Sequence, residues 1–291
     1  MESLRKLKGY NLVRSVGAQK MAIRIVQSKQ NPRVKELRAA LQRPGRGDAE
    51  TVALEGFHLV QEAIRSGLTI ETIFISQDSE SILKTLGIPD SVEILALPAE
   101  ILASAVTTEA PQPIAALAQP RGWYWQDLFK PSPGSGLILV LAGIQDPGNL
   151  GTILRSAEAF GATGIISLPG TVSQWNPKAM RASAGSVLRM PLLSASVSEC
   201  FERLRSSGHR ILAAMAHEAE PLDKVDLARS VALLIGSEGS GLSPELAAQC
   251  DDRITIPCPG PVESLNAAVA ASILLYEAAR QRTSTRARRK S

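Results

Sequence analysis

Apolar residues recur along the chain with two alternating periods, one typical of helices and one typical of strands. Short apolar or β-branched runs are separated by longer amphipathic stretches, and this alternation indicates a mostly parallel sheet covered by helices on both faces. The run Leu137–Leu141 is apolar throughout, as expected for a strand buried on both faces of its sheet. Strands are predicted at residues 51–54, 70–75, 92–95, 114–117, 137–141, 164–168, 211–214, 231–235 and 254–256. Helices are predicted at residues 31–41, 56–66, 79–86, 98–105, 152–160, 177–188, 197–206, 244–249 and 265–281.

Two domains are predicted from this pattern. A stretch of turn residues, prolines and aromatics at 119–135 is the expected linker between a small α/β domain, residues 22–118, and a larger one, residues 136–282. The chain has 291 residues, which agrees with two domains of roughly 150 residues each. A basic extension at 1–21 and a basic tail at 283–291 complete the predicted organisation.

The net charge of +4 conceals a strong asymmetry between the ends and the middle of the chain. Residues 1–46 hold 12 Lys and Arg against two acids, and residues 280–291 hold six Lys and Arg and no acid. Basic ends on an acidic body suggest a contact surface for a polyanion such as RNA. The alternative is that the ends are solvated tails, and the first 20 residues also have the composition of an organellar transit segment.

Composition excludes several classes of protein. No apolar run approaches the roughly 18 residues of a membrane span. The three cysteines and three histidines lack the spacing of a disulfide framework or a zinc site. We therefore expect a cytoplasmic protein that contacts no membrane and holds no metal.

Three segments at predicted strand ends combine glycine, proline and uncommon polar residues, and in open α/β sheets ligands bind at such ends. The first contains Asn149, which is well placed to cap the following helix, and Arg155, which falls within an apolar run and needs a partner if it is buried. The second contains Glu238 among glycines that let backbone approach a ligand closely. The third is a Pro/Gly loop that leads through Ser264 and Asn266 into the last helix. These residues predict a pocket formed by three loops, and by themselves they identify no reaction.

Taken in order, the three segments resemble the three motifs of the SpoU/TrmH family, RNA 2′-O-ribose methyltransferases of the SPOUT class. The resemblance covers about residues 137–282, and residues 31–37 with Glu55–Gly56 and 108–114 are similar to the L30e-like RNA-binding domain of many members. The matching motif residues are Asn149…Arg155, Ile235-Gly236-Ser-Glu238-Gly-Ser-Gly241-Leu242 and Ile256-Pro…Gly260…Ser264-Leu265-Asn266.

The resemblance implies an α/β fold in which the C-terminal segment threads a loop and forms a deep trefoil knot. It also implies a homodimer with the active site near the subunit interface. S-adenosylmethionine is the implied cofactor, and Gly236, Ile256 and Leu265 are expected to contact it mainly through backbone groups. Cys258 stands where many members have Met, which removes no polar group from the site.

The resemblance further implies that the ribose 2′-hydroxyl attacks the methyl group of the cofactor, without a metal and without a covalent enzyme intermediate. Arg155 matches the family's catalytic Arg. Because a guanidinium holds its proton at neutral pH, anchoring the phosphate and polarising the hydroxyl is the role we expect of it. The residues expected to orient Arg155 and the nucleotide are Asn149, Glu238, Ser264 and Asn266.

Ribosomal RNA is the substrate we expect, because the family's tRNA enzymes often lack an N-terminal RNA-binding domain. Three alternatives are a tRNA 2′-O-methyltransferase, a non-catalytic RNA-binding or ribosome-assembly factor, and a nucleotide-dependent dehydrogenase. The dehydrogenase is disfavoured because the segments lack the GxGxxG fingerprint. Two further features have open interpretations. Residues 123–125 (Trp-Tyr-Trp) either stack on bases or pack the linker, and residues 181–189 either follow the RNA backbone or form a solvated face.

Overall fold

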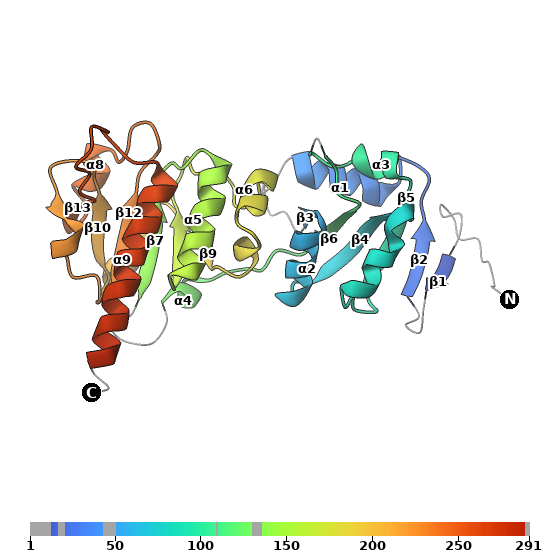
Figure 1. Ribbon diagram of the computed structural model, residues 1–291, viewed down its shortest axis with the longest axis horizontal. Coiled ribbons are helices and arrows are strands. Elements are labelled where there is room, and N and C mark those ends of the chain that lie inside the picture. The colour runs from blue at the N-terminus through green and yellow to red at the C-terminus, as the bar shows by residue number, and fades with distance from the viewer. Residues whose placement is uncertain (1–12, 17–20, 43–50, 109, 130–135, 289–291) are drawn as a thin grey trace. The chain divides into compact units, whose positions relative to one another are not determined.

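The computed structural model describes residues 13–16, 21–42, 51–108, 110–129 and 136–288. The predicted helix break at 43–47, most of the basic extension, part of the predicted linker and the last three residues lie outside the described residues. The chain forms two compact units, of which one comprises Met1–Arg121 with Trp175–Leu188 and the other Gly122–Gln174 with Arg189–Ser291 (Figure 1). The predicted domain boundaries stay predictions.

The first unit is built on a six-stranded mixed sheet. Helix α1 begins after Asn31, whose side-chain oxygen accepts a hydrogen bond from Arg33 N at 2.9 Å, and its apolar face packs against Phe74 and Leu95 of the sheet. The strand order is β1 (Val13–Val16), β2 (Met21–Ile25), β5 (Glu93–Leu97), β4 (Ile70–Ser76), β6 (Ile114–Ala118) and β3 (Val52–Glu55). The helical elements are α1 (Pro32–Gln42), α2 (Phe57–Arg65), η1 (Gln77–Thr85), α3 (Ala99–Ala103), α6 (Pro177–Ala182) and η2 (Ser186–Leu188).

The second unit is built on a seven-stranded sheet in which all the paired strands are parallel. Helix α7 and the short helices α4 and α8 cover one face of this sheet, where Phe201, Ile138 and Leu234 share a buried cluster. Helices α5 and α9 of the same unit pack side by side (Figure 1). The hydroxyls of Ser156 on α5 and Ser272 on α9 form a hydrogen bond of 2.7 Å between them. The strand order is β11 (Glu220–Pro221), β13 (Asp252–Thr255), β10 (Arg210–Ala214), β12 (Val231–Ile235), β7 (Leu137–Leu141), β8 (Gly164–Ser167) and β9 (Leu192–Ser194). The helical elements are α4 (Trp125–Leu128), α5 (Pro147–Ala159), α7 (Val197–Ser206), η3 (Leu222–Lys224), α8 (Pro244–Ala247) and α9 (Ala267–Arg288).

Most predicted elements are confirmed, and four of them differ from the structure. Helix α5 begins at Pro147, not at residue 152, because Asp146 caps it and proline suits the first helical position. The helix predicted at 177–188 is broken, because Ala184 and Gly185 have positive φ angles of 50° and 89°. Residues 77–85 form a 3₁₀ helix, and α9 begins at residue 267. The strands that the sequence did not predict are β1, β2, β9 and β11.

The predicted α/β class is confirmed for both units. A mixed sheet in the first unit and a parallel sheet in the second agree with the expected N-terminal and C-terminal folds. The deep trefoil knot depends on how the chain threads through its own loops, and it stays a prediction.

Candidate active site

Three polar loops follow the carboxyl ends of strands in the parallel sheet of the second unit. Residues 142–146 follow β7, residues 236–243 follow the neighbouring strand β12, and residues 256–266 follow β13, two strands away from β12. Because parallel strands all end at the same edge of a sheet, the three loops gather at this edge. The loops after β12 and β13 are the second and third segments predicted from sequence, and the loop after β7 leads into the first, which begins at Asp146 and continues along α5 (Pro147–Ala159).

Glu238 joins the loop after β12 to the loop after β7. One of its carboxylate oxygens, Oε1, accepts hydrogen bonds from Asn149 Nδ2 at 2.8 Å and from Asp146 N at 3.3 Å. The other oxygen, Oε2, accepts from Gln145 N at 3.3 Å. A single carboxylate therefore fixes the conformation of the β7–α5 loop and the orientation of the Asn149 side chain.

Asn266 brings the third loop into the same network. Its Nδ2 donates to Asn149 Oδ1 at 3.1 Å, and its Oδ1 accepts from Ala268 N at 2.9 Å and from Val269 N at 3.2 Å, which caps α9. The amide of Asn149 thus donates to Glu238 and accepts from Asn266. The structure brings these three predicted residues together from the loop after β12, the first turn of α5 and the end of the loop after β13.

The prediction that Asn149 caps α5 is wrong. The cap is Asp146, whose Oδ1 accepts from Asn149 N at 2.9 Å, and Asn149 lies inside the first turn of the helix. Since the cap is satisfied by Asp146, the side chain of Asn149 is free to face Glu238 and Asn266. The Asp146-Pro147 pair is a recognised signal for a helix start, and it would have identified the cap from sequence.

Arg155 lies on α5, and its side chain is exposed. The condition that a buried Arg155 would need a partner does not arise, because the apolar residues Ile153 and Leu154 turn towards the core while Arg155 faces solvent. Within the part of the chain that the structure describes, the Arg155 guanidinium has no carboxylate partner. An exposed cation without an internal partner is available to an external anion.

The residues predicted to contact S-adenosylmethionine belong to the loops after β12 and β13. A Cβ atom at the buried Gly236 would lie 2.2 Å from the carbonyl carbon of Gly241, so only glycine allows this loop to fold back on the strand. Ser237 and Gly241 close the loop with two N–H to oxygen hydrogen bonds of 3.1 Å.

These two loops fit an adenosyl group. At Gly239, Gly241 and Gly260 an added Cβ would meet nothing within 4 Å, which leaves open space beside exposed backbone groups. Ile256 and Leu265 are half-buried and add apolar surface, while Ser264 is exposed. Among the residues that the structure describes, no cluster of His, Cys, Asp or Glu could hold a metal ion.

Glu238 is anionic at neutral pH. Burial on its own raises the pKa of the Glu238 carboxyl, but hydrogen bonds from the Asn149 amide and from main-chain N–H groups outweigh burial and hold this pKa below its ordinary value of 4.5. The ionised carboxylate only accepts hydrogen bonds, which suits the three groups that donate to it, Gln145 N, Asp146 N and Asn149 Nδ2.

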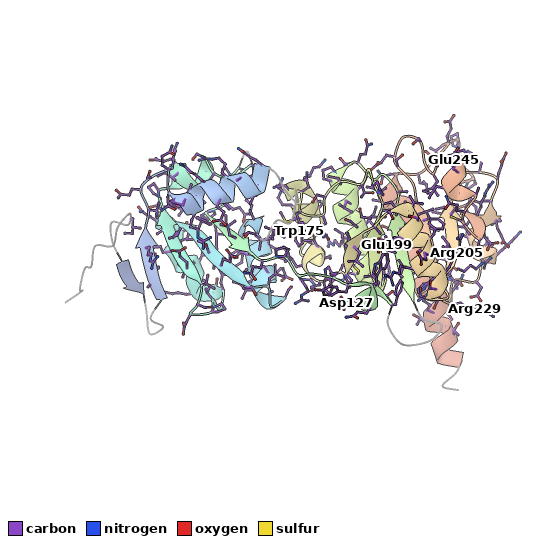
Figure 2. All side chains as sticks on the ribbon, turned by 180° about the vertical axis from the view of Figure 1, so that it is seen from behind. Asp127, Trp175, Glu199, Arg205, Arg229 and Glu245 are labelled. Carbon is purple, nitrogen blue, oxygen red and sulfur yellow. The ribbon has the colours of Figure 1, made fainter. Side chains whose placement is uncertain are left out.

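Two other features of the sequence, residues 123–125 and residues 181–189, make contacts within the protein. Trp125 stacks on Phe129 with ring centroids 5.8 Å apart, and its Nε1 donates at 3.0 Å to Glu199 of α7, so it packs the predicted linker against this helix. Glu199 is labelled in Figure 2. Arg189 makes two hydrogen bonds to the Glu158 carboxylate, at 2.6 and 2.9 Å. Arg181 NH1 lies 3.8 Å from the buried Glu55 carboxylate. RNA contact by residues 181–189 stays a prediction.

Comparison with known proteins identifies related domains over both parts of the chain. The SpoU rRNA Methylase family matches residues 136–276, and the MRM3-like substrate binding domain matches residues 31–116. A tRNA/rRNA methyltransferase of Synechocystis sp., itself uncharacterized, is 35% identical over 260 residues, which cover 88% of this chain and 93% of that protein.

Two further relatives have more specific names. The 23S rRNA (guanosine(2553)-2′-O)-methyltransferase of Bacillus subtilis is 29% identical over 86% of this chain and 97% of its own length. The AdoMet-bound rRNA methyltransferase from Sinorhizobium meliloti superposes with a TM-score of 0.77 at 30% identity, covering 89% of this chain and 98% of that chain.

The fold, the three joined loops and these relatives define an S-adenosylmethionine-dependent RNA methyltransferase. The chain belongs to the SpoU/TrmH family, and it transfers the methyl group to a ribose 2′-hydroxyl. The predicted class, cofactor and use of RNA are confirmed, and the dehydrogenase alternative is excluded. No helix in the described ranges is long and apolar enough to cross a membrane, while the cytoplasmic location stays a prediction.

The carboxylate of Glu238 predicts a specific pH dependence of stability. Because its pKa is lowered in the folded protein, its stabilising contribution is fully present above about pH 4.5, the ordinary value, and is lost as pH falls through the folded pKa. We expect the difference in unfolding free energy between wild type and Glu238→Gln to be constant from pH 8 to about pH 5 and to shrink at lower pH. Urea unfolding at a series of pH values measures this difference, and a difference that does not change with pH would contradict the role.

Proposed function

We propose that this enzyme methylates a ribose 2′-hydroxyl of ribosomal RNA. The observation that carries the proposed site is the hydrogen-bonded chain Glu238–Asn149–Asn266, which unites the three motif loops. The names of the Bacillus subtilis and Sinorhizobium meliloti relatives support ribosomal RNA as the substrate. The domain similarity at residues 31–116, described as substrate binding, supports recognition of an RNA larger than the target nucleotide.

Gly236, Ile256 and Leu265 hold the cofactor in this proposal, mainly through their main-chain groups. The cofactor supplies an electrophilic methyl group when it is bound. The glycines of the loop after β12 keep side chains away from the space next to Gly236, so the backbone can approach the ligand closely. The half-buried side chains of Ile256 and Leu265 cover apolar parts of the ligand and exclude water.

Asn149, Glu238 and Asn266 hold the geometry of the site, and Ser264 and Asn266 orient the nucleotide. Arg155 anchors an RNA phosphate and donates hydrogen bonds that polarise the 2′-hydroxyl as it attacks. Its guanidinium keeps its proton throughout, because arginine is not deprotonated in proteins near neutral pH. Most of the rate enhancement then comes from holding the hydroxyl in line with the methyl group.

The test of this function is transfer of labelled methyl from S-adenosylmethionine into unmodified RNA, separated into tRNA and the two large ribosomal RNAs. We expect label in one ribosomal RNA, recovered as alkali-resistant 2′-O-methylated dinucleotides. We expect Arg155→Ala to reduce the rate by about 100-fold, as removal of one charge-stabilising donor does in other enzymes. Arg155→Lys keeps the positive charge and loses the planar guanidinium, so we expect its rate of methyl transfer to lie between those of wild type and Arg155→Ala.

Three outcomes would contradict parts of the proposal. Label confined to tRNA would overturn the choice of substrate and keep the chemistry. Full activity of Arg155→Ala would overturn the role given to Arg155. If free RNA takes up no label, the assay is repeated with assembled ribosomal subunits. Label in the subunits would show that the substrate is a particle. Absence of label in the subunits as well would favour a non-catalytic RNA-binding factor.

The cofactor loops generate a second prediction, on binding. Gly236→Ala would place a methyl group 2.2 to 2.4 Å from backbone atoms of Gly241 and Leu242, and the loop must move to accept it. We expect the dissociation constant for S-adenosylmethionine to rise at least about 10-fold, which is about 1.4 kcal/mol. Gly122→Ala is the matched control, because Gly122 is exposed, lies outside the cofactor loops, and its new Cβ would meet no atom closer than 3.9 Å, so this variant should bind as wild type does. Isothermal titration calorimetry measures both, and equal affinities would remove Gly236 from the cofactor site.

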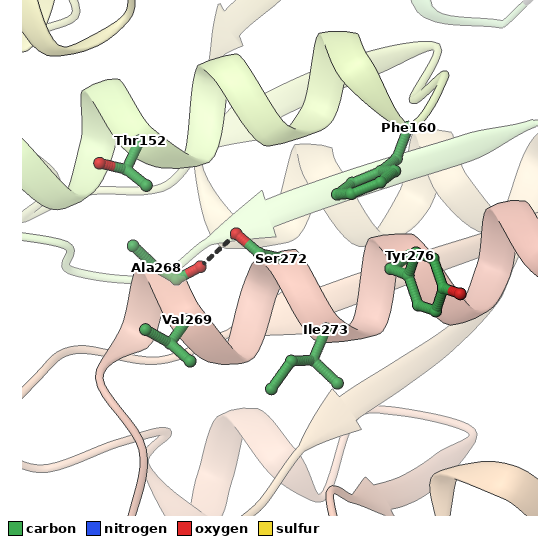
Figure 3. Close-up of a pocket in the computed structure, with 7 residues that line it drawn as sticks. All are labelled: Thr152, Phe160, Ala268, Val269, Ser272, Ile273 and Tyr276. Atoms are coloured by element: carbon green, nitrogen blue, oxygen red, sulfur yellow. Dashed lines mark hydrogen bonds between the residues drawn. The ribbon is translucent and has the colours of Figure 1, made fainter.

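We further propose that the enzyme is a homodimer, built on a groove between α5 and α9. The groove has a volume of about 300 Å³ and is lined almost entirely by apolar surface (Figure 3). Val269 and Tyr276 on its α9 side are 48% and 56% exposed, which is high for large apolar residues. A second copy related by a two-fold axis would cover the same patch on both subunits. The residues that line it are Thr152, Phe160, Ala268, Val269, Ser272, Ile273 and Tyr276.

The position of Arg155 supports this choice of interface. It follows Thr152 by three residues on α5, so the two side chains are neighbours on the helix surface and Arg155 flanks the groove. A dimer formed here would place Arg155 near the subunit interface. This agrees with the active-site location that the family resemblance implies.

A charge in the groove should prevent dimerisation. We expect wild type to sediment as a dimer at micromolar concentration and Val269→Asp as a folded monomer, because a carboxylate cannot be buried there without a partner. Val262→Asp is the matched control, since Val262 is 56% exposed and lies in the loop after β13, outside the groove, and this variant should stay dimeric. A monomeric wild type, or a dimeric Val269→Asp, would refute the proposed interface.

A further inference from the structure

The loop that follows β8 lies along the loop between β7 and α5. Strand β8 pairs with β7, and the pairing is continued beyond the strands by Leu168 N, which donates to Leu141 O at 2.9 Å. Further on, Val172 N donates to Ile144 O at 2.8 Å. This loop belongs to none of the three motifs, yet it is hydrogen-bonded to the residues that lead from β7 into the first of them.

The side chain of Thr171 is at the centre of this support. Its hydroxyl donates to Leu141 O at 3.0 Å and accepts from Gly143 N at 3.1 Å, so one hydroxyl satisfies two main-chain groups of the loop after β7. Gly143 has a φ of +77°, a left-handed conformation that is readily lost without such a restraint. The loops also approach closely, because a Cβ added at Gly170 would lie 3.6 Å from Gly143 Cα.

The β7–α5 loop is thus held from two sides. Thr171 fixes its beginning at Leu141 and Gly143, and Glu238 fixes its end at the N–H groups of Gln145 and Asp146. The end of this loop is the start of α5, where Asp146 caps the helix. The direction in which the loop leaves β7 therefore sets the placement of the helix that carries Asn149 and Arg155.

We propose that Thr171 is a positioning residue for methyl transfer, whose hydroxyl holds the β7–α5 loop so that Asn149 and Arg155 meet the substrate ribose correctly. This inference rests on the roles given to those two residues in the proposed function. The hydrogen bonds of the Thr171 side chain go to Leu141 and Gly143 and not to the two loops assigned to the cofactor, so we expect its loss to act on the chemical step and to leave cofactor affinity unchanged. Small misplacement of reacting groups is enough for a large loss of rate.

Thr171→Val tests the inference, because valine keeps the branched shape and removes both hydrogen bonds. Thr171→Ser restores the hydroxyl. Thr163→Val is the matched control: Thr163 Oγ1 donates to Leu137 O at 3.1 Å, so it makes the same kind of bond to the opposite end of the same strand. The three variants and wild type are compared in kcat for methyl transfer to the RNA that wild type methylates, in the dissociation constant for S-adenosylmethionine, and in melting temperature.

We expect Thr171→Val to lower kcat by about 10-fold or more, with the cofactor dissociation constant within about 2-fold of wild type. Thr171→Ser should recover most of the lost kcat. Thr163→Val should keep the wild-type kcat even though its melting temperature falls by a similar amount to that of Thr171→Val.

Two results would overturn the inference. A wild-type kcat in Thr171→Val would show that the loop does not need the hydroxyl, and an equal loss of kcat in Thr163→Val would show that the effect is one of general stability. Arg155→Ala, assayed in parallel, separates this failure from failure of the proposed function. If Arg155→Ala is inactive while Thr171→Val is fully active, only the positioning role is wrong, whereas an active Arg155→Ala removes the role on which the inference rests.

Discussion

The parallel pairing of β7 with β12 is the constraint on which the rest of the second unit depends. Its register places Leu137 opposite Val231 and Leu141 opposite Ile235, and Ala142 N extends the ladder to Ile235 O at 2.8 Å. Both strands therefore end at the same level, and the loops that follow them start side by side. All five residues of each strand are buried. A slip of the register would therefore leave main-chain N–H and C=O groups without hydrogen-bond partners where water cannot reach them.

The active site builds on this register with few side chains. Glu238 accepts hydrogen bonds from the neighbouring loop and from Asn149. Asn149 in turn accepts a hydrogen bond from Asn266, which caps the last helix. Two of these side chains each serve two purposes. The Glu238 carboxylate fixes the β7–α5 loop and orients the Asn149 amide, and the Asn266 amide both donates to Asn149 and caps α9. In the proposed function, this arrangement holds the substrate in place at little cost in side-chain entropy, because the side chains are ordered before the ligand binds. Thr171 adds hydrogen bonds at the beginning of the same β7–α5 loop, at Leu141 and Gly143.

Predictions from sequence succeeded where a segment's local pattern agreed with its burial. The apolar strands β7, β12 and β4 and the amphipathic helices α1 and α7 were each predicted close to their observed bounds. Short edge strands such as β9 and β11 were not predicted, because two or three residues carry no periodicity and their pairing is set by a neighbour. The break between α6 and η2 was also missed, since Ala184 adopts a positive φ that its residue type does not favour.

The sequence by itself determined the α/β class, the residues of the three motif loops and, through their resemblance to a family, the chemistry. It did not determine which atoms meet. Asn149 lies 89 residues from Glu238 and 117 from Asn266, so these contacts exist only because strand order and register bring distant loops to one edge. The exposure of Arg155, the cap at Asp146 and the hydroxyl of Thr171 were likewise decided by packing. A hydrogen bond depends on distances of a few tenths of an ångström, and only the assembled sheet sets them.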